Sequence, residues 1–186
     1  MTRPRTFGVE RAERSSTSMH ATYLLSVYLH ILCAIVWIGG IAFLVFVVVP
    51  WLRSGGQPIA GVFLRETGTR FRSIGWACFV ILLVTGTFNL YVRGVRLGDL
   101  ASATWRSSPY GEAVLLKLGL FVGVLTISGI HDFVVGPRAT RAIEADPASV
   151  ESGRLRKQAQ RLGRLNAILA LLLVGVAITL VRGVPW

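Results

Sequence analysis

The longest charge-free stretch of this chain is the feature that most restricts its fold. No Asp, Glu, Lys or Arg occurs between Arg14 and Arg53, whereas about 20 apolar residues are enough for an α-helix to cross a bilayer. In a bilayer the backbone must satisfy its own hydrogen bonds, which favours a helix for such a segment. We therefore predict a first transmembrane helix at about residues 21–51 and expect Pro50 to end it.

Three further apolar segments follow and predict helices at about residues 73–92, 111–135 and 162–181. The mean hydropathy of +0.60 and the 53% of hydrophobic residues are high for a soluble domain. The predicted fold is all-α, an integral membrane bundle of four transmembrane helices. Residues 1–20 are expected to form a polar, basic N-terminal tail, and residues 21–186 a single membrane domain. The first segment is too long for the apolar part of a signal peptide, so we expect it to be retained.

The excess of basic residues has a simple explanation in a membrane protein. The chain has 20 Lys and Arg against 9 Asp and Glu, a net charge of +11. Most of this excess flanks the apolar segments, where Arg attracts lipid headgroups and sets orientation. We therefore expect the lipid bilayer, and no nucleic acid, as a partner.

The distribution of these charges predicts the topology. Eleven basic residues lie between the first and second or the third and fourth helices, against eight on the other side. We expect a multi-pass protein of the cell inner (plasma) membrane. Because basic loops stay in the cytoplasm, both termini are expected on the outer side of that membrane.

A few polar side chains inside the helices are the candidates for function, because an ionisable group in a membrane is costly unless it has a role or a partner. His30 lies in the first helix, Asn89 in the second and Lys117 in the third. At 1.5 Å per residue, Lys117 lies roughly 7 Å beyond Glu112, and Asn89 roughly 6 Å before Arg93. His30 lies roughly 14 Å inside the same face of the membrane, so the three are expected to share the outer half.

Structural interpretations of the same residues remain open. Lys117 could extend toward nearby headgroups, and His30 could be a neutral imidazole bonded to a neighbouring helix. His131 and Asp132 lie about 21 Å deeper than Lys117 and belong to the opposite interface.

Small residues predict close helix packing. Cys33 and Cys78 both lie in apolar segments and are expected to be packing residues, not a disulfide or a zinc site. Gly119 with Gly123 forms a G-x-x-x-G pattern, and the pair Gly39–Gly40 offers a second surface for close approach.

The helix sequences also carry a resemblance. The segment YLHILCAIVWIGGIAFLVFVVVPWLR resembles the first membrane helix of the CopD copper-resistance family, in which a His precedes an apolar turn and W-x-G-G. FRSIGWACFVILLVTGTFNLY and YGEAVLLKLGLFVGVLTISGIHDFVVGPR are similar to that family's second and third helices, and the resemblance covers residues 23–181. It implies a membrane protein associated with copper handling, which binds a transition-metal centre in the outer half of the bundle with His30 as metal ligand.

Two alternatives accompany this interpretation. A His in the first helix and a Lys in the third are also similar to the HemJ type of protoporphyrinogen oxidase, which implies haem b bound by His30 and Lys117 for electron transfer or porphyrinogen oxidation. The other alternative is a structural subunit of a larger membrane complex without a cofactor. The sequence leaves copper and haem b undecided, with His30, Lys117 and Asn89 as cofactor-binding residues, and assigns no catalytic residue. A membrane or periplasmic protein partner is compatible with each alternative, and no oligomeric state is indicated.

Overall fold

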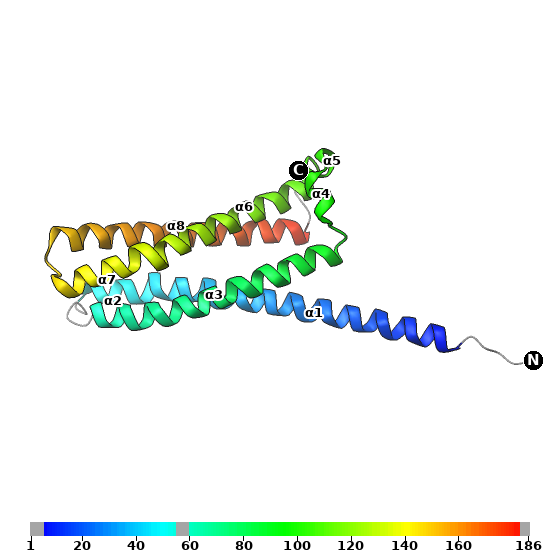
Figure 1. Ribbon diagram of the computed structural model, residues 1–186, viewed down its shortest axis with the longest axis horizontal. Coiled ribbons are helices and arrows are strands. Elements are labelled where there is room, and N and C mark those ends of the chain that lie inside the picture. Colours follow the sequence, from blue (N-terminus) through cyan, green and yellow to red (C-terminus); the bar gives the residue numbers. More distant parts are fainter. Residues whose placement is uncertain (1–5, 55–59, 183–186) are drawn as a thin grey trace, which may run out of the picture.

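Helices form nearly all of the structure. The computed structural model describes residues 6–54 and 60–182 (Figure 1). Four stretches of this part are long and apolar enough to cross a membrane: Thr17–Trp51, Arg65–Val92, Pro109–Ala145 and Val150–Arg182. The predicted all-α fold with four transmembrane helices is therefore confirmed. The elements, in chain order, are α1 (Thr6–Phe43), the π-helix η1 (Leu44–Val48), α2 (Val49–Ser54), α3 (Ala60–Val92), α4 (Leu97–Ala101), α5 (Ala103–Arg106), α6 (Pro109–Ile130), the π-helix η3 (His131–Val135), α7 (Gly136–Ala145) and α8 (Val150–Arg182).

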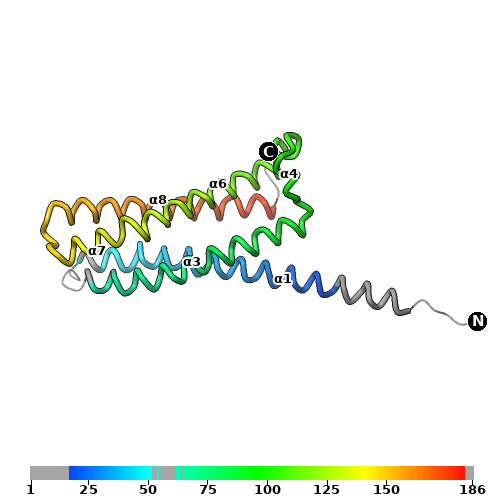
Figure 2. Tube along the Cα trace, viewed as in Figure 1, coloured from blue at the N-terminus to red at the C-terminus, as the bar shows by residue number. Residues whose placement is uncertain are grey.

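The long helices associate as two pairs. α1 packs along α3, and α6 with α7 packs along α8 (Figure 2). The short helices α4 and α5 connect the pairs at one end of the bundle, which we call the α4–α5 end, and the turn between α7 and α8 lies at the other, the α7–α8 end. α8 also contacts α1, and α7 contacts α3, which joins the pairs into one bundle.

The helices extend beyond the bounds predicted from hydropathy. α1 begins at Thr6 and therefore continues through most of the predicted tail, while α3 begins at Ala60 and α8 at Val150. These added turns are rich in Arg, Glu, Gln and Lys, which favour helix but do not belong in hydrocarbon. Hydropathy identifies only the apolar part of a helix, so the predicted bounds were too short.

The expectation that Pro50 ends the first helix was wrong, and the π-helices explain why. In η1 the chain makes a wider turn, with the Val49 N–H bonded to the Leu44 carbonyl, and Pro50 then lies in the first turn of α2. η3 does the same before Pro137, which lies in the first turn of α7. A proline is tolerated in a first helical turn because its missing N–H has no partner to lose there.

Aromatic side chains form the centre of the core. Trp37 of α1 packs edge-on against Phe79 of α3 with ring centroids 4.9 Å apart, and Phe121 of α6 meets Phe79 from the other pair at 6.2 Å. Val124 and Ala170 complete this contact between the two pairs, and both are buried. The core therefore lies at mid-length, where the helix pairs meet.

The small residues pack as predicted at some positions only. Cys33 and Cys78 are buried free thiols in the core, as expected of packing residues. A Cβ at Gly40 would overlap the Phe71 ring, and one at Gly123 would lie 3.6 Å from Leu169. A Cβ at Gly39 or Gly119 would meet open space, so only one glycine of each predicted pair lies at a close helix contact.

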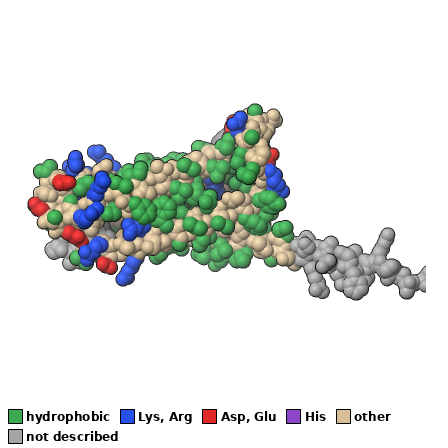
Figure 3. All heavy atoms as spheres, in the orientation of Figure 1, with side chains coloured by type: hydrophobic (Ala, Val, Ile, Leu, Met, Phe, Trp, Pro, Cys, Tyr) green, Lys and Arg blue, Asp and Glu red, His purple; other side chains and the backbone are tan. Residues whose placement is uncertain are grey.

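The surface of the bundle is apolar around its middle. Large side chains such as Phe46, Val122 and Leu171 are more than 60% exposed, and Figure 3 shows hydrophobic side chains between a basic α7–α8 end and a smaller charged group at the α4–α5 end. Such a belt is stable in lipid and would aggregate in water. The chain is a multi-pass membrane protein.

Candidate functional site

His30 is held against α3 by a short hydrogen bond. Its Nδ1 atom lies 2.8 Å from Oγ1 of Thr85. One turn earlier on α1, the buried Ser26 hydroxyl donates to the Thr85 carbonyl oxygen at 3.5 Å. Residues 26 and 30 lie on the same face of a helix, so Thr85 is contacted from two successive turns.

The partners of Thr85 define the protonation of His30. The Thr85 hydroxyl donates to the Ile81 carbonyl oxygen at 2.6 Å, so its single proton is already used. The hydroxyl oxygen can then only accept from His30, which places the imidazole proton on Nδ1. The lone pair on Nε2 of a neutral His30 is thereby left for another partner, which is the arrangement that orients a metal-ligating histidine.

Gly86 provides the space for this ring. A Cβ at Gly86 would lie 3.3 Å from Cε1 of His30 and 3.8 Å from its Nδ1. The first distance is tighter than ordinary van der Waals contact, so any larger residue would press on the imidazole. The position of the His30 ring thus depends on two successive residues of α3, Thr85 and Gly86.

Asn89 lies one turn beyond Thr85 on the same helix, toward the α4–α5 end. Its Oδ1 atom is buried and accepts no hydrogen bond from the described residues. A buried amide oxygen without a donor costs free energy. Asn89 therefore supplies an unused acceptor near the level of His30.

Positive charge surrounds this level of the bundle. Lys117 of α6 is half-buried and lies within electrostatic range of both His30 and Arg93. Arg93, just after α3, donates from Nε to the Tyr23 hydroxyl at 3.5 Å, and this bond raises the pKa of the guanidinium. The sequence-predicted residues His30, Asn89 and Lys117 thus all lie in the half of the bundle nearer the α4–α5 end.

His131 belongs to a separate polar group near the other end. Its Nδ1 atom lies 2.9 Å from Oδ1 of Asp132, and the indole N–H of Trp76 donates to Oδ2 of the same carboxylate at 3.1 Å. Arg72 donates to the Asp132 backbone oxygen at 3.0 Å and stacks over Phe133 at 5.5 Å. These contacts join α3 to η3 and engage both carboxylate oxygens of Asp132.

The donors around His30 limit the kind of metal site they can form. Among the described residues no three His, Cys, Asp or Glu side chains are grouped as a metal site requires. One imidazole nitrogen and one amide oxygen suit a passing contact with a metal ion, whereas structural centres use three or four ligands. The positive charge of Lys117 and Arg93 also opposes long retention of a cation.

Sequence reasoning missed the partners of the candidate residues. Thr85, which contacts the His30 ring, and Tyr23, which accepts from Arg93, were not among the predicted site residues. The helical spacing of Ser26 and His30 was a usable signal that both side chains contact the same neighbouring helix. Gly86 left no signal, because a glycine in a membrane helix is common.

Comparison with known proteins gives a family and two relatives. The sequence profile of the family described as Copper resistance protein D matches residues 65–180. An uncharacterized protein of Aquifex aeolicus (strain VF5) is 36% identical over 159 residues, which cover 84% of this chain and 94% of the relative. Copper transport protein CutJ of Bacillus subtilis (strain 168) is 32% identical over 108 residues, which cover 58% of this chain and only 18% of CutJ. No solved structure matches the chain.

Proposed function

The chain belongs to the Copper resistance protein D family, and from this premise we propose that it handles copper ions as cargo, which contact Nε2 of His30. The similarity to a copper transport protein supports copper as the metal. The match covers 18% of CutJ, and copper transport by this chain is part of the proposal.

The observation that carries the proposal is the hydrogen bond between His30 and Thr85. It leaves a neutral imidazole with a free Nε2 lone pair inside a membrane helix, and imidazole suits both copper oxidation states. One turn along α3 from Thr85, the Asn89 side-chain oxygen accepts no hydrogen bond from the described residues and is a candidate second ligand atom. A single nitrogen ligand in positive surroundings releases its ion readily, which fits transfer better than storage.

The proposed site lies in the half of the bundle that the basic-residue distribution places outside. Copper would reach it from the α4–α5 end, where α1 extends beyond the end of α3 (Figure 1). This route requires that the His30 half of the bundle lies on the outer side of the membrane.

The experiment measures copper bound to the purified full chain in detergent, by competition with a Cu(I) chelator and by elemental analysis. We expect His30→Ala to lower copper affinity at least tenfold, because it removes the one free imidazole nitrogen of the site. His20→Ala is the matched control, since His20 is an exposed histidine of the same helix. His131→Ala should also retain copper. Loss of copper in His131→Ala with retention in His30→Ala would reject the site.

Haem b is a second candidate, favoured by one observation. Lys117 places positive charge near His30, and Arg93 lies in turn within electrostatic range of Lys117; such charge suits the carboxylates of a haem better than a metal cation. His30 would hold the haem iron, and the haem would supply electron-transfer chemistry. A visible spectrum of the same preparation separates the candidates, because haem gives an intense Soret band and Cu(I) gives none. Protein with neither copper nor haem would favour a structural subunit.

A further inference from the structure

A basic cavity lies between α7 and α8, far from His30. It has a volume of about 520 Å³ and is lined by Arg138, Arg154, Leu155, Lys157, Gln158 and Arg161. A neighbouring cavity shares three of these residues, Arg138, Arg154 and Leu155, and adds Glu151 as its one acidic side chain. The two cavities form a continuous basic surface at the α7–α8 end.

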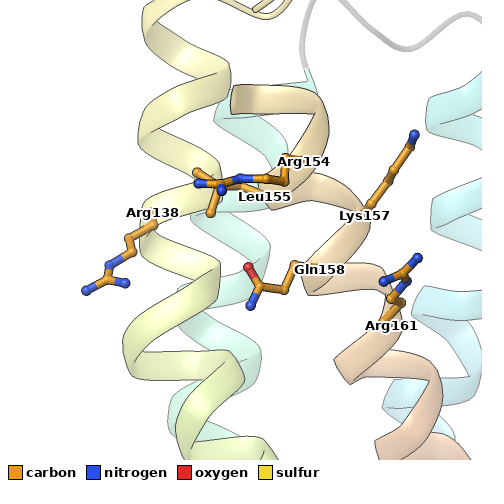
Figure 4. A pocket seen from close by; sticks show the side chains of 6 residues that line it. All are labelled: Arg138, Arg154, Leu155, Lys157, Gln158 and Arg161. Atoms are coloured by element: carbon orange, nitrogen blue, oxygen red, sulfur yellow. The ribbon is translucent and has the colours of Figure 1, made fainter. Parts of the chain in front are cut away.

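The side chains of the cavity come from both helices. Figure 4 shows Arg154 and Gln158 extending from α8 toward α7, with Leu155 between them, while Arg138 extends from α7. Lys157 and Arg161 extend from α8 on the side away from α7. The four α8 residues at positions 154, 157, 158 and 161 follow helical spacing, so a single face of α8 carries them.

The basic residues of the cavity form no salt bridge with the acidic side chains that the structure describes. The ion pairs formed by side chains that the structure describes involve Arg65 and His131, and none involves a basic residue of the cavity. Glu151 is the one acidic side chain among the residues that line the two cavities, so the basic residues there repel one another with little compensation. An anion bound among them would relieve this repulsion and accept charge-assisted hydrogen bonds from Arg.

The depth of the cavity indicates what anion could occupy it. The uncharged part of α8 begins at Leu165, which marks the hydrocarbon border. Arg161 lies about 6 Å before that residue and Arg154 about 16 Å, at 1.5 Å per residue. Phospholipid headgroups form a layer of about 5–8 Å next to the hydrocarbon. Arg161 therefore lies within the phosphate layer, whereas Arg154 lies on the water side of that layer.

We propose that this basic cavity binds the phosphate headgroup of an anionic phospholipid such as phosphatidylglycerol. A basic pocket between membrane helices at this level is a recognised type of lipid headgroup site. Arg161 lies at the level of the phosphate, and Arg154 and Gln158, which extend toward α7, add charge and hydrogen-bond donors on the water side of this level. The proposal is independent of copper or haem binding.

The test measures lipid retained by the full chain in native mass spectrometry, after exchange into detergent containing phosphatidylglycerol or phosphatidylcholine. The cavity variant is Arg138→Gln/Arg154→Gln. The control Arg106→Gln/Arg156→Gln removes the same charge from exposed residues outside the cavity. A basic residue near an anionic surface is worth about fivefold in binding, so we expect phosphatidylglycerol retention to fall about 5- to 25-fold in the cavity variant. The control should change less than twofold.

Three outcomes would overturn the proposal. Equal retention by the two double variants would show that net charge, not the cavity, attracts the lipid. Equal retention of phosphatidylcholine and phosphatidylglycerol by the unmodified chain would show no headgroup preference. Complete displacement of the lipid by millimolar inorganic phosphate would identify a site for a free anion. Circular dichroism of both double variants identifies unfolding, and in that case single Arg154→Gln and Arg156→Gln replace them with the same expectation.

Discussion

Nδ1 of His30 on α1 lies 2.8 Å from Oγ1 of Thr85 on α3, and the Thr85 hydroxyl donates to the Ile81 carbonyl oxygen at 2.6 Å. This order of donors determines which imidazole nitrogen is free. It also connects the two most closely packed helices of the bundle at the proposed copper contact.

Replacing Thr85 by Val removes the acceptor while keeping the shape of the side chain. The His30 proton is then no longer held on Nδ1, and loss of such an orienting partner lowers metal affinity by about 10- to 100-fold. The measurement is Cu(I) competition in detergent. Thr87→Val is the control, because Thr87 is exposed on the same helix and its hydroxyl donates to the Leu83 carbonyl oxygen of that helix. Equal affinity of the two variants would contradict the role of Thr85.

A methyl group at Gly86 should displace the His30 ring. The added Cβ would lie 3.3 Å from Cε1 of the imidazole, so the ring must move or the helices separate slightly. We expect Gly86→Ala to lower Cu(I) affinity at least fivefold with unchanged helix content. Gly119→Ala, whose Cβ would face open space, should have no effect on affinity. If Gly86→Ala bound Cu(I) as tightly as the unmodified chain, the position of the His30 ring would not depend on Gly86.

The charge of Lys117 distinguishes a cation from an anionic cofactor. If copper is the ligand of His30, Lys117→Met removes a repulsive charge and should raise Cu(I) affinity about tenfold, or about 1.4 kcal/mol. Lys157→Met at the opposite end is the control. A fall in affinity, or loss of a Soret band, would favour haem with Lys117 as a partner of its carboxylates.

The Trp76 bond to Asp132 should contribute to stability and not to copper binding. Trp76→Phe removes the indole donor, which lies 3.1 Å from Oδ2, and leaves that oxygen with one partner fewer. The expected loss is about 1–3 kcal/mol of unfolding free energy, measured by thermal or denaturant unfolding in detergent. Trp51→Phe, which changes a half-exposed ring near the same end, should cost less than Trp76→Phe. Equal losses would mean that packing alone accounts for the effect.

Single cysteines test the orientation of the bundle in intact cells. Ser54 and Ala148 are exposed near the α7–α8 end and Thr104 at the α4–α5 end, whereas Ser152 is only 1% exposed and unsuitable for labelling. In a background without Cys33 and Cys78, an impermeant maleimide should label a cysteine at 104 and not at 54 or 148, because the basic loops are expected in the cytoplasm. Labelling at 54 and 148 instead would place the His30 half of the bundle inside.

Hydropathy was sufficient to predict the membrane class and the number of spans. A charge-free run such as the one before Arg53 has a single stable solution in a bilayer, because its backbone must bond to itself. The helix ends were less predictable. Polar helical turns outside the membrane carry no hydropathy signal, and the effect of Pro50 depends on the π-turn that precedes it.

The sequence by itself determined which residue types are available within the membrane: one histidine in the first span, an asparagine in the second and a lysine in the third. Their common level followed from the constant rise of a helix. Only the tertiary structure decided that His30 faces Thr85, that Gly86 makes room for the ring, and that the Asn89 oxygen accepts no hydrogen bond from the described residues. Such relationships depend on the rotation and separation of neighbouring helices. Packing between side chains sets both, and the periodicity of one segment contains no information about its neighbour.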